Sequence, residues 1–334
     1  MRLMHWLRAT LVAAAMLAAA LVLTACGRQP TDHVPTPAPQ QQPEDMGTAA
    51  WPRSFHNADG STTPIPARPT RILSTSPTLT GTLLAIDAPV VASATLVDGS
   101  FLGQWAALAQ ARGVEKLWPA GRMDLEAVLA VAPDLIVVST GGADSTLAHV
   151  QQLRSVAPTI VLDYGGEPWQ SLARQLGQAT GHEAQAQARI TAFDAYVAQA
   201  RQQLQLPAGQ ANIVSYNGPA ISNPVATPEG PHGRLLSALG FRMEAPDPAW
   251  HSSAESARNF VWAPYEKLPS LRAETTFLLR GDDSRAAAFL ADPVLANLPS
   301  VRNGQVYGLG VHSFRIDYFS ATEIVDGMVE RFGR

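Results

Sequence analysis

The sequence predicts an α/β fold of two Rossmann-like lobes joined by a single long α-helix, and three observations predict it. Short apolar runs alternate with helical segments, which is typical of a mainly parallel sheet covered by helices. Residues 182–206 contain neither glycine nor proline and are rich in strong helix formers. The second half of the chain then repeats part of the pattern of the first half. The 334 residues are enough for two hydrophobic cores.

The first lobe is predicted over residues 51–181. It opens with a short hairpin at residues 51–66, whose turn is Asn57-Ala-Asp-Gly60. The runs that follow predict strands at residues 71–74, 90–94, 135–138 and 159–162, and helices at residues 83–86, 101–112, 124–131 and 147–156.

The segment 182–206 is expected to be the helix between the lobes. Apolar residues recur every three or four positions along it, which gives the helix one apolar stripe. Gly181 precedes the segment, and Pro207 ends it. Periodicity alone also allows an ordinary surface helix of one large α/β domain. The stripe consists of Ile190, Phe193, Val197, Ala200 and Leu204.

The second lobe is predicted over residues 207–334, with strands at 211–216 and 276–279, a helix at 232–239 and a polar loop at 246–261. Part of it repeats the first lobe. Glu126 lies eight residues before Asp134, and Glu266 lies eight residues before Glu274. In both places an apolar run, a polar loop and a helix follow. This repetition predicts two related lobes with a cleft between them.

The N-terminus predicts export and lipid anchoring. Two arginines and an apolar core at residues 9–23 are typical of a signal peptide, expected over residues 1–25. Residues 23–26, Leu-Thr-Ala-Cys, match the lipobox of bacterial lipoproteins, in which Cys26 is acylated. The alternative is cleavage elsewhere, with Cys26 lost or free. Residues 26–50 are rich in proline and glutamine and predict a disordered tether. We therefore expect a cell-envelope protein, lipid-anchored and facing the periplasm or the exterior.

Several functions are disfavoured by the sequence. The net charge of −4 and the lack of a long basic run argue against nucleic-acid binding. Neither a Gly-x-Ser-x-Gly elbow nor a phosphate-binding glycine loop is present, so no catalytic residue is predicted. A metal site across the cleft is also not expected, because His232, His251 and His312 all lie in the second half.

A binding role fits the sequence better. Three arginines follow predicted strand ends, where open α/β sheets bind ligands. Guanidinium groups suit planar, oxygen-rich anions, and aromatic rings can stack on such ligands. The alternatives are a surface salt bridge for each arginine and core packing for Trp118. The predicted ligand-binding residues are Arg122, Arg280, Arg315, Trp118, Tyr216 and Trp250.

The chain resembles the iron–siderophore class of periplasmic substrate-binding proteins, which serve ABC importers. The resemblance rests on residues 55–66, 69–74 and 123–136. More narrowly, residues 79–89, 169–172 and 313–321 are similar to members that bind ferric catecholates such as enterobactin. The resemblance implies a class III fold, with two α/β lobes bridged by one stiff helix. It also implies a ferric catecholate ligand, for which Arg315 matches a binding arginine.

The resemblance further implies that Glu126 and Glu266 dock on the ABC permease. A ferric tris-catecholate is trianionic and already saturates its iron, so we expect no protein ligand to the metal and no cofactor. We expect a monomer. Two alternatives stay open: the same fold binding a ferric hydroxamate, haem or a cobalamin, and an α/β hydrolase of the envelope.

Overall fold

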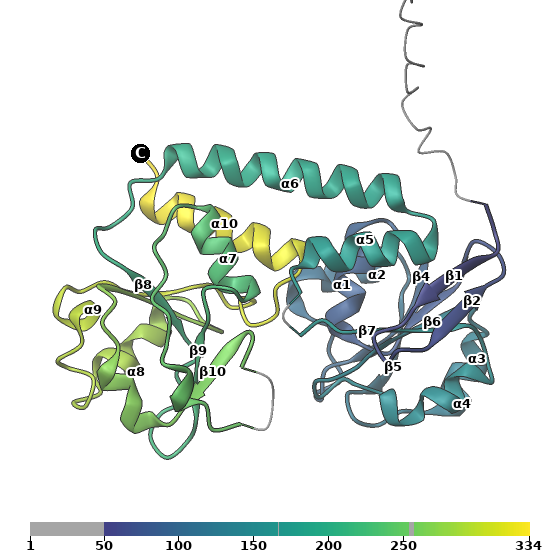
Figure 1. Ribbon diagram of the computed structural model, residues 1–334, viewed down its shortest axis with the longest axis horizontal. Coiled ribbons are helices and arrows are strands. Elements are labelled where there is room, and N and C mark those ends of the chain that lie inside the picture. Colours follow the sequence, from purple (N-terminus) through teal and green to yellow (C-terminus); the bar gives the residue numbers. More distant parts are fainter. Residues whose placement is uncertain (1–49, 166, 254–256) are drawn as a thin grey trace, which may run out of the picture. The chain divides into compact units, whose positions relative to one another are not determined.

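The computed structural model describes residues 50–165, 167–253 and 257–334 (Figure 1). The expected signal peptide, Cys26 and all but the last residue of the expected tether lie outside these residues. Within them, no helix combines the length and the apolar character needed to cross a bilayer.

The part of the chain that the structure describes begins with the predicted hairpin. Strands β1 (Arg53–His56) and β2 (Thr62–Ile65) pair antiparallel around the Asn57 turn. The Asn57 amide nitrogen donates to Thr63 Oγ1 at 2.8 Å, and its oxygen accepts from the Val161 backbone N–H at 2.8 Å. A single buried asparagine therefore shapes the turn and attaches the hairpin to the first lobe.

The first lobe is a five-stranded parallel sheet in the order β5-β4-β3-β6-β7. Its central strands are completely buried, as expected for a sheet covered on both faces. The strands are β3 (Ile72–Ser74), β4 (Val90–Thr95), β5 (Glu115–Pro119), β6 (Leu135–Ser139) and β7 (Thr159–Leu162), and the helices are α1 (Pro77–Ala85), α2 (Gly103–Ala111), α3 (Leu125–Val131), α4 (Val150–Arg154) and α5 (Trp169–Thr180).

Three elements of this lobe differ from expectation. Helix α1 starts at Pro77 rather than at residue 83, because Ser76 caps it and proline fits the first helical turn. The segment through Trp118 forms the edge strand β5, where no strand was predicted. Helix α5, which the sequence analysis did not predict, packs against the long helix that follows it.

The long helix is α6 (Glu183–Gln203), 21 residues or roughly 31 Å. Its buried face includes Ile190, Phe193, Val197 and Ala200, which confirms the predicted stripe. Leu204 is buried too, but it has left the helix and forms a bridge with Gly333. Helix α6 joins the two lobes and lies along α5 and α10 (Figure 1).

The second lobe contains a mixed sheet in the order β10-β9-β8-β11-β12, in which β9 runs antiparallel to its neighbours. Residues 241–244 contribute only the bridge between Ala211 and Met243. The strands are β8 (Ala211–Val214), β9 (Asn223–Ala226), β10 (Phe260–Ala263), β11 (Thr275–Leu278) and β12 (Val306–Gly308), and the helices are α7 (Pro231–Ala238), α8 (Ala286–Leu290), α9 (Pro299–Arg302) and α10 (Tyr318–Phe332).

Candidate ligand-binding cleft

A cavity of about 500 Å³ is lined by residues of both lobes. The first lobe contributes the loops that follow β6 and β7, at residues 141–143 and 163–165. The second lobe contributes the start of β10 and the loop at residues 314–316, which follows β12. The cavity therefore lies where loops after the sheet strands meet, as ligand sites of open α/β sheets do. We call it the cleft cavity.

Two arginines pack on one aromatic ring of this cavity. The Arg280 guanidinium carbon lies 3.6 Å from the Phe314 ring centroid, and that of Arg315 lies 5.3 Å from it. Arg315 and Phe314 both line the cleft cavity. In the part of the chain that the structure describes, neither arginine is paired with a carboxylate. Two positive charges therefore lie together at the cavity without a counter-ion from the described residues.

Burial lowers the pKa of Arg280, and the nearby charges of Arg315 and Arg285 lower it further. Because the unperturbed pKa of a guanidinium is so high, Arg280 still carries its charge at neutral pH. The mutual repulsion of Arg280 and Arg315 is a cost that a bound anion would relieve.

A hydrogen-bond network of the first lobe fixes the other ring near Arg315. The Arg315 guanidinium carbon is 5.3 Å from the Tyr164 ring centroid. The Tyr164 hydroxyl donates to Asp144 at 2.6 Å, and the Ser76 hydroxyl donates to the other oxygen of Asp144 at 2.5 Å. Burial, together with Asp144, raises the pKa of Tyr164, so the phenol stays neutral. Arg315, a residue of the second lobe, thus packs on a ring that the first lobe holds.

An ion pair links the lobes at the same cavity. Arg258 Nη2 lies 2.8 Å from Asp163 Oδ2, and both residues line the cavity. The two side chains are 59% and 40% exposed, so the pair contributes little to stability. Its position matters more, because an entering anion would compete with Asp163 for Arg258.

The second lobe adds an apolar wall. The Phe260 and Phe314 rings are stacked, with centroids 6.2 Å apart and planes 15° apart. His232 packs on Phe260 and bonds through Nε2 to the Ser313 carbonyl at 2.7 Å, so that nitrogen must donate. Burial lowers the pKa of His232 to about 4, which keeps the ring neutral. His232 therefore supports the loop that carries Phe314 and Arg315.

The three predicted arginines have different surroundings. Arg315 lines the cleft cavity, and Arg280 stacks on Phe314 beside it. Arg122 is exposed on the loop after β5 and lines neither the cleft cavity nor the cavity of about 80 Å³ that adjoins Arg315. Ala120, two residues earlier, does line that smaller cavity. The structure thus brings two of the three guanidiniums together.

The three predicted aromatic residues lie elsewhere. Trp118 is only 6% exposed and packs in the core of the first lobe, because β5 extends through it; this corrects its assignment to the cleft. Tyr216 donates to Asp292 at 2.5 Å and packs edge-on against Phe289. Trp250, like Tyr216, packs against the core cluster of the second lobe that contains Phe289. None of the three lines the cleft cavity.

Other aromatic residues line the cavity instead: Tyr164, Phe260, Trp262 and Phe314. Tyr164 follows a predicted strand, and Phe314 lies beside Arg315, so both could have been predicted at the cleft from their positions in the sequence. Phe260 belongs to the predicted polar loop 246–261 and Trp262 follows it directly, whereas the structure places both residues in β10.

Glu126 and Glu266 occupy matching positions in the two lobes. Both are exposed, and each lies in the first turn of the helix that follows an edge strand, β5 or β10. Glu126 belongs to α3, and Glu266 belongs to a 3₁₀ helix, Tyr265–Ser270. The sequence repetition that singled them out thus corresponds to a structural one.

Among the described residues, no group of three or more His, Cys, Asp or Glu side chains could hold a metal ion.

Comparison with known proteins finds periplasmic binding proteins that match most of the chain. The family profile for periplasmic binding proteins matches residues 72–311. The ferric enterobactin-binding periplasmic protein FepB of Escherichia coli O6:H1 is 42% identical over 295 residues, which cover 85% of this chain and 92% of that protein.

Solved structures of similar proteins also match most of the chain. The crystal structure of holo-ViuP matches with a TM-score of 0.84 and 53% identity, covering 86% of this chain and 97% of the other. Staphylococcus aureus SirA complexed with staphyloferrin B matches with a TM-score of 0.68 and 18% identity, covering 84% of this chain and 98% of the other, which shows a shared fold.

Proposed function

The chain belongs to the periplasmic binding protein family, and from this premise we propose that it captures a ferric siderophore and delivers it to an ABC permease for iron uptake. Its fold is the class III fold of that family, with two α/β lobes on either side of one long helix. The relatives are binding proteins, so we propose a binding role without catalysis.

We propose a ferric catecholate, enterobactin-like, as the ligand. One observation carries this choice: Arg280 and Arg315 lie together on Phe314 without a partner carboxylate in the described chain. A ferric tris-catecholate has three negative charges and flat aromatic rings, which suit guanidinium groups and stacked side chains. Its iron is already saturated, so the protein has to supply charge and rings rather than metal ligands.

The hydroxamate alternative fits the cavity less well. A ferric hydroxamate is neutral and would leave the two guanidinium charges without compensation. The FepB relative is named for ferric enterobactin, in line with the anionic choice.

Attachment and delivery complete the proposal. We propose that Cys26 is acylated and holds the monomeric protein to the membrane from outside. Glu126 and Glu266, one on each lobe, would then meet positively charged groups of the permease. Their exposure and matching positions support this role.

Tryptophan fluorescence provides the test, because Trp262 lines the cleft cavity. Titration with ferric enterobactin should quench the emission and saturate at lower concentration than titration with ferrichrome, haem or cobalamin. Tighter binding of ferrichrome would overturn the catecholate assignment. Saturable binding of haem or cobalamin alone would overturn the siderophore assignment.

A further inference from the structure

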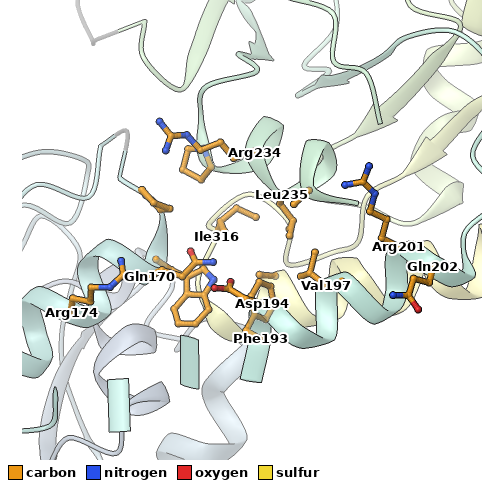
Figure 2. Close-up of a pocket in the computed structure, with 16 residues that line it drawn as sticks. Gln170, Arg174, Phe193, Asp194, Val197, Arg201, Gln202, Arg234, Leu235 and Ile316 are labelled. Atoms are coloured by element: carbon orange, nitrogen blue, oxygen red, sulfur yellow. The ribbon is translucent and has the colours of Figure 1, made fainter. Parts of the chain in front are cut away.

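A second cavity, of about 960 Å³, lies along the long helix (Figure 2). Its walls come from α5 in the first lobe, α6 itself, α7 in the second lobe, and residues of the 316–321 segment. It shares Pro231 and Ile316 with the cleft cavity, but none of its remaining lining residues. We call it the helix cavity.

The floor of the helix cavity is apolar. Phe193 and Val197 lie one turn apart on α6 and are 3% and 7% exposed. Leu235 of α7 faces the same space and is 8% exposed, and Ile316 lies beside it (Figure 2). The lining of α6 runs from Phe193 to Gln202, nine residue steps or about 14 Å along the helix axis. The cavity is therefore long enough to hold an extended apolar chain.

The rim of the helix cavity is positively charged. One arginine comes from each helix: Arg174 from α5, Arg201 from α6 and Arg234 from α7 (Figure 2). Among the described residues, Asp194 is the only acidic member of this lining, so the net charge of the described lining is +2, three arginines minus one aspartate. None of the three guanidiniums forms an ion pair with a described carboxylate. An apolar floor beneath unpaired cations suits a ligand with an apolar body and an anionic head.

We propose that the helix cavity binds a single-chain anionic amphiphile of the fatty-acid type, at a site separate from the siderophore cleft. The apolar chain lies on Phe193, Val197 and Leu235, and the carboxylate meets the arginines of the rim. The ligand contacts helices of both lobes, so it bridges them beside α6.

The test is a calorimetric titration of the full chain carrying Cys26→Ser, so that the protein has no acyl chain of its own. Laurate is added below its micelle concentration, and dodecanol serves as the uncharged ligand of equal length. Laurate should bind at one site and at least tenfold more tightly than dodecanol. Equal affinity for the two, or no binding of laurate, would overturn the proposal.

Variants then locate the site. Arg201→Gln with Arg234→Gln should weaken laurate binding at least tenfold, whereas Arg302→Gln, an exposed arginine on α9, should not. Arg315→Ala should leave laurate binding intact while it weakens the ferric siderophore. Laurate binding that is lost in Arg315→Ala and kept in the double variant would place the amphiphile in the cleft and refute the second site. Failure of siderophore binding alone would affect only the proposed function.

Discussion

Arg280 and Arg315 share the ring of Phe314, at 3.6 and 5.3 Å from its centroid, although α8, α9 and β12 lie between them in the chain. Arg280 reaches this position from a left-handed backbone conformation, with φ of +62°, just after β11. Its backbone N–H donates to Ser313 Oγ at 3.1 Å, which joins the two arginine-bearing loops. The two cations are therefore held in place before any ligand arrives, which reduces the entropy cost of binding.

Removal of either cation should weaken an anionic ligand. Arg315→Ala and Arg280→Ala are each expected to reduce affinity for ferric enterobactin more than tenfold, which corresponds to at least about 1.4 kcal/mol. Fluorescence titration at low and high salt measures this, and the wild-type protein should lose more affinity with salt than either variant. Arg302→Ala is the matched control on an exposed helix. An unchanged affinity in Arg315→Ala would remove that residue from the site.

Two substitutions of Tyr164 separate the contribution of its ring to ligand binding from that of its hydroxyl. Tyr164→Phe keeps the ring beneath Arg315 and loses only the bond to Asp144, so we expect a few-fold weaker binding. Tyr164→Ala removes the ring itself and should weaken binding more than tenfold. The same titration measures both variants, with circular dichroism to verify folding. If the two variants behave alike, the ring does not support Arg315.

The sequence predicted the structure best where the position of a residue depends on one helix or strand alone. The stripe through Ile190, Phe193 and Val197 predicted α6 because a helix face depends only on local spacing. Arg315 was predicted at the cleft because a predicted strand end and a family motif coincide there, and it does line the cleft cavity. Trp118 was misplaced because residues that extend an edge strand look like loop until the neighbouring strand is known.

The aromatic wall was missed for a related reason. Strand β9 carries Pro224, which argues against a strand, and it pairs antiparallel with β10 across more than thirty residues. The positions of Phe260 and Trp262 depend on this long-range pairing. No local pattern could have placed them beside Phe314, whereas the pairing in the structure does.

The ion pair between Arg258 and Asp163 should influence ligand exchange. Asp163→Asn removes the carboxylate that competes with an anion for Arg258, so we expect ferric enterobactin to bind a few-fold more tightly. Stopped-flow fluorescence should show this mainly as slower dissociation. Glu330→Gln, at an exposed position on α10, is the charge-matched control. Weaker binding in Asp163→Asn would mean that the carboxylate helps to hold the ligand.

Glu126 and Glu266 should matter for uptake and not for capture. Neither residue lines the cleft cavity, so Glu126→Ala with Glu266→Ala should leave siderophore affinity unchanged. Uptake of iron-loaded siderophore by cells that express the variant should fall several-fold, because each lobe loses a charged contact with the permease. Normal uptake would contradict the docking role, and loss of affinity would indicate a folding defect instead.

Asp317 should make the protein less stable as pH rises through the mildly acidic range. Asp317 is 2% exposed; its carboxylate caps α10 by accepting from the Ser320 N–H at 2.9 Å and also accepts from Gln104 of the first lobe at 3.2 Å. Burial raises its pKa from 3.8 to about 6, against the effect of these bonds. The folded state therefore binds this proton more tightly than the unfolded state. The contribution of this bound proton to the free energy of unfolding is on the order of 3 kcal/mol. It is fully present below pH 4 and is lost as pH rises through 6.

Asp317→Asn should remove this loss. The amide oxygen can still accept from Ser320, and its nitrogen can donate to Gln104 Oε1, which is buried without a partner. Above pH 6 the variant should therefore unfold at higher urea concentration than the wild type, and below pH 4 the difference should shrink because the wild-type carboxyl is then protonated. Urea unfolding at pH 4, 5, 6 and 7.5 measures this, with Glu330→Gln as the exposed control. A variant that is less stable than the wild type at pH 7.5 would show that the charged cap is stabilising despite its burial.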